Sequence, residues 1–358
     1  MVNRLLVIIA SIAVIGMLSV GCGSSGSAKS TAVGDKTAAA ASEALQAPNA
    51  GAVTLITSTS QLPGASTQLL QLKLTEEGKA QADGMFDFQH YDSATLFKSS
   101  AEPGALLDGN IDIGFIQPGY FYDNGALWAN MFDIAFLYTD VDNMMTVLDP
   151  EGDVGKWCEQ QIWDQFHLKI LSPYYLGRRD IWMSADKTVK TPADLKGVKI
   201  RMPNSASFLD MGKALGAEPT PLDSSETYLA MQTGTVDAQE NIILSSYANT
   251  MQEVCKTIIL TDHMITSNWI CVNGDKWESM SSEQQEKLTA VVRAAAKANN
   301  DDVIAQEEKI LDECVDKHGI TLQEPDKDAF RNYALEYYLS NPDNEKNWNM
   351  DIFNDLNK

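Results

Sequence analysis

Strand-like and helical segments alternate along this chain from residue 51 onward, and this alternation limits the possible folds more than any other feature. Runs rich in β-branched and aromatic residues, such as 52–59 and 168–177, are typical of strands. A helical segment over 65–82 follows the first of these runs, and the longest helical pattern covers 281–319. Alternating strands and helices predict an α/β protein, and 358 residues are enough for two lobes.

The N-terminal segment follows a different pattern and is expected to lie outside this fold. An apolar run over 5–20 ends just before Cys22, which is typical of an export signal rather than of a membrane-spanning helix. The letters LSVGC resemble a bacterial lipobox, so we expect residues 1–21 to be a lipoprotein signal peptide and Cys22 to be lipidated. Plain secretion is the alternative. Residues 22–50 then carry the lipidated cysteine and a small, polar, Ala-rich stretch that is predicted to be a disordered tether.

The chain is strongly acidic, with 27 Lys and Arg against 49 Asp and Glu and a formal net charge of −22. Such a surface repels nucleic acid and anionic lipid, which excludes both as general partners. We therefore expect contact with a membrane only through the lipid anchor. A strong net charge also keeps an exported protein soluble and monomeric.

Four cysteines remain after Cys22, and no two of them form a C-x-x-C pair: they are Cys158, Cys255, Cys271 and Cys314. The four histidines show no ligand spacing beside them, so no metal site is expected. Export permits up to two disulfides in one of three pairings. Alternatively, all four thiols are small, buried apolar groups.

Common catalytic signatures are absent from the sequence. It contains no G-x-S-x-G, no H-E-x-x-H, no Walker loop and no G-x-G-x-x-G. We therefore expect neither an enzyme nor a cofactor. The acidic stretch 140–153 lacks the turn glycine and closing glutamate of a calcium loop in register, and it is predicted to be a solvated loop and helix face.

A cation is predicted at a point where a strand meets a helix. Val198, Ile200 and Met202 alternate with polar residues, and Pro203 then breaks the strand before a helical segment. Arg201 therefore lies at the carboxyl end of a strand, beside a helix N-terminus. In open α/β sheets, ligands bind at such places.

The middle third of the chain carries several motifs in a fixed order. They are Gly177-Arg178-Arg179, the run 191–201, the run 215–221, the run 226–241 that ends in QEN, and the run 253–263. This order closely resembles the solute-binding proteins of TRAP transporters, of the DctP type. The resemblance covers about a quarter of the chain in its strongest part.

The resemblance implies a two-lobed, periplasmic-binding-protein-like α/β fold, with a ligand cleft between the lobes and a long C-terminal helical region. Lobe I is expected to comprise 51–176 plus about 267–306, and lobe II 177–266 plus about 307–358. The cleft would close over a small organic acid. The acid would then pass to a membrane permease of separate small and large subunits, so that the receptor is extracytoplasmic, in the periplasm or at the cell surface.

The resemblance also implies which residues hold the ligand. Arg201 matches the family arginine that pairs with the ligand carboxylate, and its planar guanidinium suits a carboxylate. Arg179 takes the second arginine position, although Arg178 beside it is an alternative. Asn241, in QEN, matches the asparagine that hydrogen-bonds the same carboxylate. Two further pocket-lining candidates are Asn204 and Ser224.

Two other functions stay open at this point. The same cleft serves equally for ligand sensing by a membrane kinase, and a secreted enzyme acting on carboxylated sugars is a third possibility. Two arginines suit a dicarboxylate, a uronate, a sialic acid or an aromatic acid, and the sequence does not choose between them.

Overall fold

The computed structural model describes residues 51–357, so the predicted signal peptide, Cys22 and the tether lie outside the described residues. A nine-stranded mixed sheet forms the centre, with the strand order β2-β1-β3-β8-β4-β7-β5-β6 and β9 paired to β8. Its strands are β1 Val53–Ser58, β2 Phe86–Tyr91, β3 Ile113–Ile116, β4 Leu168–Met183, β5 Lys199–Met202, β6 Glu218–Pro221, β7 Ala238–Ile242, β8 Thr257–Asn273 and β9 Thr321–Gln323.

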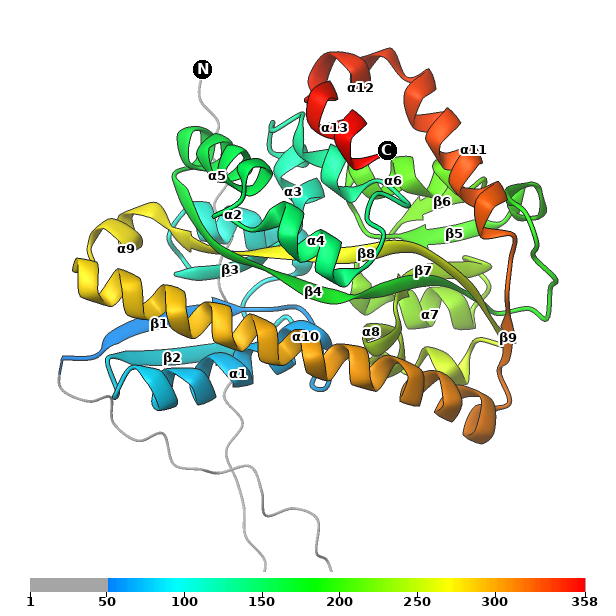
Figure 1. Ribbon diagram of the computed structural model, residues 1–358. Helices are drawn as coiled ribbons and strands as arrows, with labels where there is room; N and C mark the ends of the chain where they lie inside the picture. The colour runs from blue at the N-terminus through cyan, green and yellow to red at the C-terminus, as the bar shows by residue number, and fades with distance from the viewer. Residues whose placement is uncertain (1–50, 358) are drawn as a thin grey trace, which may run out of the picture. The chain divides into compact units, whose positions relative to one another are not determined.

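Thirteen α-helices connect and cover these strands within the described part of the chain (Figure 1). They are α1 Ser66–Gln81, α2 Glu102–Leu107, α3 Pro118–Asp123, α4 Val141–Leu148, α5 Asp153–Phe166, α6 Ala206–Ala214, α7 Thr227–Gln232, α8 Ile243–Ala248, α9 Gly274–Glu278, α10 Ser282–His318, α11 Lys327–Ser340, α12 Pro342–Asn347 and α13 Met350–Leu356. None of the described helices is long and apolar enough to cross a membrane.

The two longest strands, β4 and β8, run antiparallel to each other and join two halves of the sheet (Figure 1). Near one end of the pair, β3 adds to β8 and carries β1 and β2 beside it. Near the other end, β7 adds to β4 and carries β5 and β6. This arrangement agrees with the predicted two-lobed fold, because only β4, β8 and α10 need to span both halves.

The sequence predicts a strand over 168–177, whereas β4 continues beyond it to Met183. Gly177 has φ +139°, and the pairing with β8 shifts register between Tyr175 and Gly177. The glycine admits this backbone conformation without breaking the strand, since it has no Cβ. The chain therefore continues as one irregular strand.

Helix α10 was predicted over 281–319, and the structure confirms it. Ser281 is its N-cap and forms a capping box with Gln284, while Gly319 ends it in the left-handed conformation. The helix packs against α1 and β4. It continues unbroken past residue 306, where we expected the chain to leave lobe I.

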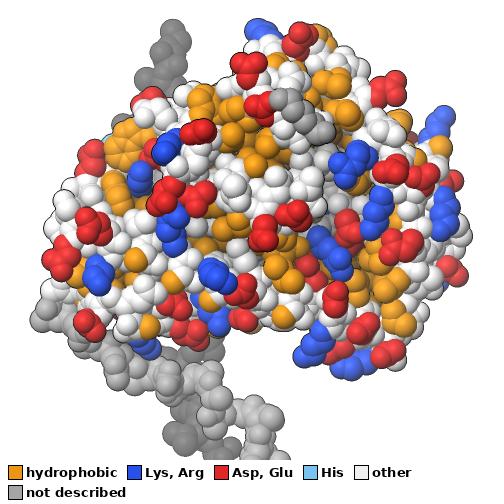
Figure 2. All heavy atoms as spheres, viewed as in Figure 1, with side chains coloured by type: hydrophobic (Ala, Val, Ile, Leu, Met, Phe, Trp, Pro, Cys, Tyr) orange, Lys and Arg blue, Asp and Glu red, His pale blue; other side chains and the backbone are white. Residues whose placement is uncertain are grey.

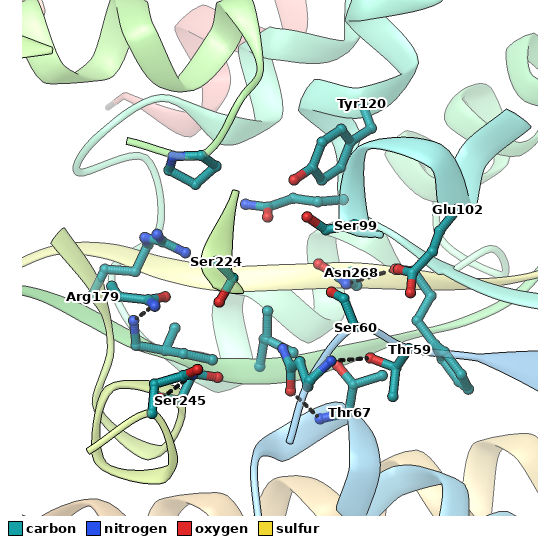
Figure 3. Close-up of a pocket in the computed structure, with 18 of the residues that line it drawn as sticks. Thr59, Ser60, Thr67, Ser99, Glu102, Tyr120, Arg179, Ser224, Ser245 and Asn268 are labelled. Atoms are coloured by element: carbon teal, nitrogen blue, oxygen red, sulfur yellow. Dashed lines mark hydrogen bonds between the residues drawn. The ribbon is translucent and has the colours of Figure 1, made fainter. Parts of the chain in front are cut away.

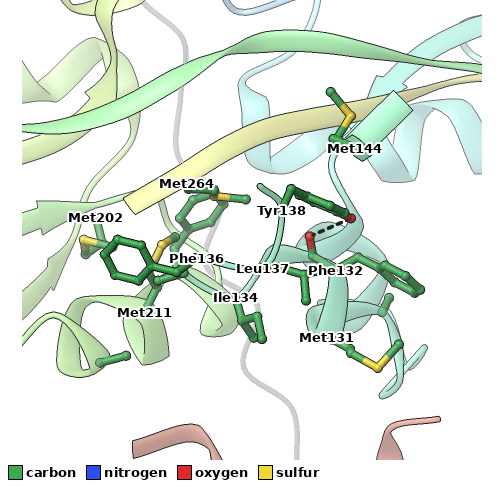
Figure 4. Packing of buried hydrophobic residues seen from close by; sticks show 14 of the residues in the cluster. Met131, Phe132, Ile134, Phe136, Leu137, Tyr138, Met144, Met202, Met211 and Met264 are labelled. Atoms are coloured by element: carbon green, nitrogen blue, oxygen red, sulfur yellow. Dashed lines mark hydrogen bonds between the residues drawn. The ribbon is translucent and has the colours of Figure 1, made fainter. Parts of the chain in front are cut away.

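The largest apolar core lies under the segment 129–138, which is buried along its whole length (Figure 4). Phe132 and Trp269 stack edge to face in this core, with ring centroids 6.2 Å apart. Met264 comes from β8, and Met202 and Met211 come from β5 and α6, so the cluster ties together elements distant in sequence. Burial of this size is the main stabilising term in such a fold.

All four described cysteines are free and buried, which agrees with the apolar alternative rather than with disulfides. The acidic stretch forms α4 and its flanking turns, with Asp140 accepting from Asn143 at the helix start, as a helix cap does. Figure 2 shows Asp and Glu spread over one face among Lys and Arg, without a broad basic area.

Candidate functional site

A polar pocket lies where the two sets of parallel strands end. The loops that follow β1, β3 and β5 supply Gln61, Gln117 and Pro203 to its wall, and β4 and β7 supply Arg179 and Asn241. Such positions beyond the carboxyl ends of strands are the usual ligand sites of open α/β sheets. The lining residues are Thr59, Ser60, Gln61, Thr67, Ser99, Glu102, Phe115, Gln117, Tyr120, Leu176, Arg179, Arg201, Pro203, Ser224, Asn241, Ile242, Ser245, Asn249 and Asn268 (Figure 3).

Arg201 is the central cation of this pocket, although it is only 3% exposed. Its Nε and Nη2 donate to the carbonyl oxygen of Leu222, at 3.0 and 2.7 Å. Within residues 51–357, no carboxylate forms an ion pair with it. Burial lowers the pKa of Arg201 to about 10, so the side chain stays charged at neutral pH. Arg201 is therefore not part of an ordinary surface ion pair.

Arg179 lines the same pocket but is already paired. Its Nε and Nη2 donate to the two carboxylate oxygens of Glu240, at 2.5 and 2.7 Å, and its guanidinium lies 4.9 Å from the ring centroid of Phe208. The Nε2 atom of His263 lies 3.2 Å from Oε2 of the same carboxylate. Burial raises the pKa of Glu240, but the Arg179 charge and the hydrogen bonds from His263 and Arg179 outweigh burial and lower it to about 2.

The neighbouring arginine, Arg178, does not line this pocket. It lies near Asp262 and Glu307, with its Nε 3.6 and 4.0 Å from their carboxylate oxygens. Because side chains alternate along a strand, Arg178 and Arg179 project from opposite faces of β4. The structure thus places Arg179, rather than Arg178, at the predicted site.

Of the remaining predicted residues, Asn241 and Ser224 line the pocket, whereas Asn204 is exposed and does not. The side-chain oxygen of Asn241 accepts from the backbone N–H of Ile242 at 2.9 Å, which leaves its amide N–H groups for another partner. The structure therefore brings four of the five predicted side chains together around one space.

Sequence reasoning missed the wall formed by the first part of the chain. Its members are neutral hydrogen-bonding residues and one carboxyl group, which are Thr59, Ser60, Gln61, Thr67, Ser99, Glu102, Gln117 and Tyr120, and Asn268 of β8 adds to this wall. The positions of some of these residues could have indicated a ligand site. Thr59 to Gln61 directly follow a strand, as does Gln117, and ligands bind beyond the carboxyl ends of strands. Among nearby aromatic residues, Tyr120 lines the pocket, whereas Phe121, Trp182 and Trp269 are buried in the core.

Metal-ligating side chains do not gather at this pocket. Among the described residues, one group could hold an ion, namely His167, Asp275 and Glu278. The histidine lies 3.3 and 3.8 Å from the two carboxylates, and all three side chains are well exposed. This arrangement is an ordinary surface contact between the α5–β4 turn, which holds His167, and helix α9, which holds Asp275 and Glu278.

The pocket at the meeting point of two strand sets defines a binding protein of the two-lobed α/β class. Residues 60–341 match the model of bacterial extracellular solute-binding proteins, family 7 (DctP), and the chain belongs to this family. The predictions of the TRAP-type family, the fold and the solute-binding role are thereby confirmed.

Known relatives and structures agree with this assignment. The sialic acid-binding periplasmic protein SiaP of Vibrio cholerae is 26% identical over 74% of this chain and 81% of its own length. The 2,3-diketo-L-gulonate-binding periplasmic protein YiaO of Escherichia coli is 28% identical over 74% of this chain and 79% of its own. A TRAP periplasmic solute-binding protein of Roseobacter denitrificans, solved with 3-deoxy-D-manno-oct-2-ulosonic acid, superimposes with a TM-score of 0.80 at 27% identity, over 86% and 99% of the two chains. All three are named for binding a solute.

Proposed function

We propose that this protein is an extracytoplasmic receptor that binds a small carboxylate-containing organic acid and delivers it to a TRAP permease of small and large subunits. The observation that carries the proposal is Arg201, a buried guanidinium that lines the pocket without a carboxylate partner among the described residues. A buried charge without a partner is costly, and a ligand carboxylate provides that partner.

The other pocket side chains have supporting roles in this proposal. Asn241 donates its free amide N–H to the same carboxylate, and Ser224 provides a hydroxyl beside it. Arg179 is held by Glu240 and presents its remaining donors to the pocket. The named ligands of SiaP and of the Roseobacter denitrificans structure, sialic acid and 3-deoxy-D-manno-oct-2-ulosonic acid, are both carboxylic acids.

Delivery to a membrane partner requires motion and an anchor, and both are part of the proposal. The lobes assigned to 51–176 plus about 267–306 and to 177–266 plus about 307–358 close over the acid by bending where β4, β8 and α10 cross between them. Lipidation of Cys22 would hold the receptor at the membrane surface. Mass spectrometry of the exported protein tests the anchor, since an unmodified Cys22 excludes it.

The binding role is tested by calorimetry after a thermal-shift screen of about a hundred carboxylates. A ligand at roughly 100 times its dissociation constant adds about 2.7 kcal/mol of stability, which such a screen detects. Arg201→Ala leaves the ligand charge unpaired, a loss of about 3–5 kcal/mol, or a hundredfold to several thousandfold in affinity. Arg331→Ala, which removes an exposed arginine of α11 outside the pocket, is the matched control. Equal affinity of the Arg201→Ala protein and the control contradicts the proposal.

Delivery is tested separately with membrane vesicles that contain the two permease subunits. Uptake of the identified acid must depend on added receptor. Binding without receptor-dependent uptake would instead favour the sensing function.

A further inference from the structure

The pocket holds one carboxyl group at the side opposite its arginines. Glu102 is the first residue of α2, and Figure 3 shows it across the pocket from Arg179. Its Oε1 is buried without a hydrogen-bond partner among the described residues, and the backbone N–H of Ser60 donates to the carboxyl group. No lysine or arginine of the described chain pairs with it. The pocket is therefore cationic at one side only.

The surroundings of Glu102 keep it from ionising easily. Burial raises its pKa to about 8, and the Ser60 N–H offsets only part of this rise. The charged and titratable groups that face the same space are Arg179, Arg201 and Tyr120. A neutral carboxyl group both donates and accepts a hydrogen bond, which matches an alcohol hydroxyl.

Unused hydrogen-bonding capacity continues along the pocket between the two sides. Besides Glu102, the side-chain oxygens of Asn268 and Ser245 are buried without partners in the described chain. Hydroxyl and amide side chains of Ser60, Ser99 and Gln117 line the same space. Buried polar groups that remain unpaired are costly, so a ligand that satisfies them carries hydroxyl groups along its length.

From this arrangement we propose that the pocket selects hydroxylated monocarboxylic acids of the sugar-acid type, and that Glu102 excludes dicarboxylic acids by binding the neutral, hydroxyl-bearing end of the ligand. The proposal rests on the function proposed above, since it needs the ligand carboxylate at Arg201. A second carboxylate would lie beside Glu102 without a cation, and a buried anion without a partner is strongly disfavoured.

Four six-carbon acids test the two parts of this proposal by calorimetry: D-gluconate, D-glucarate, hexanoate and adipate. They differ only in the presence of hydroxyl groups and in the number of carboxylates. We expect D-gluconate to bind at least tenfold more tightly than D-glucarate, and at least tenfold more tightly than hexanoate. Equal binding of D-glucarate overturns the exclusion of diacids, and equal binding of hexanoate overturns the need for hydroxyl groups.

Two variants assign the effect to Glu102. Glu102→Gln keeps a neutral donor and acceptor of the same shape, so the preference for D-gluconate over D-glucarate should persist. Glu102→Lys places a cation where the second carboxylate lies, and the affinity ratio should shift at least tenfold toward D-glucarate. If the folded Glu102→Lys protein keeps the original ratio, Glu102 does not face the far end of the ligand. If the lysine variant fails to fold, Glu102→Ala replaces it, and an unchanged affinity for D-gluconate then overturns the proposal.

Failure of this inference is distinguishable from failure of the binding role itself. If none of the four acids binds but another carboxylate of the wider screen binds in an Arg201-dependent manner, the ligand class is wrong and the receptor function stands. If no carboxylate binds, or if Arg201→Ala binds like the parent, both fail together.

Discussion

Arg178 and Arg179 are consecutive residues of β4, yet their guanidinium groups serve different faces of the sheet. Arg179 pairs with Glu240 at the ligand pocket, whereas Arg178 lies beside Glu307 of α10 on the other face. The two residues lie where β4 passes between the halves of the sheet and shifts its register against β8. One short piece of strand thus connects the pocket to the long helix.

The Arg179–Glu240 pair should matter for stability even without a ligand. Arg179→Ala leaves the Glu240 carboxylate, which is 0% exposed, with His263 as its one side-chain hydrogen-bond partner within residues 51–357. Breaking a buried pair from one side costs about 3–5 kcal/mol. Urea unfolding of the ligand-free protein measures this loss.

A double variant provides the control for that measurement. In Arg179→Ala/Glu240→Gln the unpaired charge is gone, so part of the lost stability should return. A loss below about 1 kcal/mol in the single variant would show that water reaches Glu240 and that the pair is not sealed.

Glu307 should make stability depend on pH. Its side chain accepts from the Tyr175 hydroxyl and from the Arg178 N–H, and burial raises its pKa from 4.5 to about 7. The folded protein therefore keeps this proton up to about pH 7, whereas the unfolded chain releases it near pH 4.5. The stabilisation that comes from protonated Glu307 is therefore complete below pH 4.5, and it is lost as the pH rises through 7.

Comparison with Glu307→Gln isolates this effect from other buried carboxyl groups, such as Asp133 and Asp180. Between pH 5 and pH 8 the wild type should lose more unfolding free energy than the variant, by at most about 3 kcal/mol. Urea unfolding of each protein at pH 5 and at pH 8 gives its loss of unfolding free energy, and the two losses are then compared. Parallel losses in the two proteins would contradict the raised pKa of Glu307.

Motif residues made one side of the pocket predictable from the sequence. Arg201, Arg179, Asn241 and Ser224 lie in a run whose order is specific enough to assign each position, and the structure brings them together. Strand β1 and helix α10 were also predictable, because β1 is a run rich in β-branched residues and α10 begins at a Ser281 capping box and ends at Gly319.

The other side of the pocket was not predictable for a physical reason. Glu102 stands before Pro103 at a helix start, where an exposed glutamate is common, yet its Oε1 atom is buried and the backbone N–H of Ser60, distant in sequence, donates to its carboxyl group. Neutral residues such as Ser99 and Asn268 carry no pattern that distinguishes a pocket wall from a surface. Asn204 lies close to Arg201 in sequence, yet its side chain is exposed and does not line the pocket.

Replacement of Asn241, in β7, should weaken ligand binding more than replacement of Asn204, which follows Arg201 in sequence. Asn241→Ala removes an amide donor to the ligand carboxylate, and a hydrogen bond to a charged group is worth about 1.5–3 kcal/mol, or roughly ten- to a hundredfold in affinity. Asn204→Ala, at an exposed position, should bind within about threefold of the parent. Calorimetric titration of both variants with the acid found in the screen decides this. A larger loss for Asn204→Ala would mean that the loop after β5 turns inward when the ligand binds.

Arg201→Lys tests whether the shape of the guanidinium matters in addition to its charge. Nε and Nη2 of Arg201 already hold the carbonyl of Leu222, so the planar group binds a backbone oxygen with one edge and has other donors for the ligand. A lysine ammonium carries its charge on one nitrogen, so it cannot bind the Leu222 carbonyl and the ligand carboxylate in the same geometry. We therefore expect Arg201→Lys to keep the preference for anions but to lose at least tenfold in affinity, which corresponds to about 1.4 kcal/mol. Calorimetry beside Arg201→Ala should place the lysine variant between the parent and the alanine variant. Parental affinity in the lysine variant would show that charge alone holds the acid, and that the contact with Leu222 has no part in positioning the guanidinium.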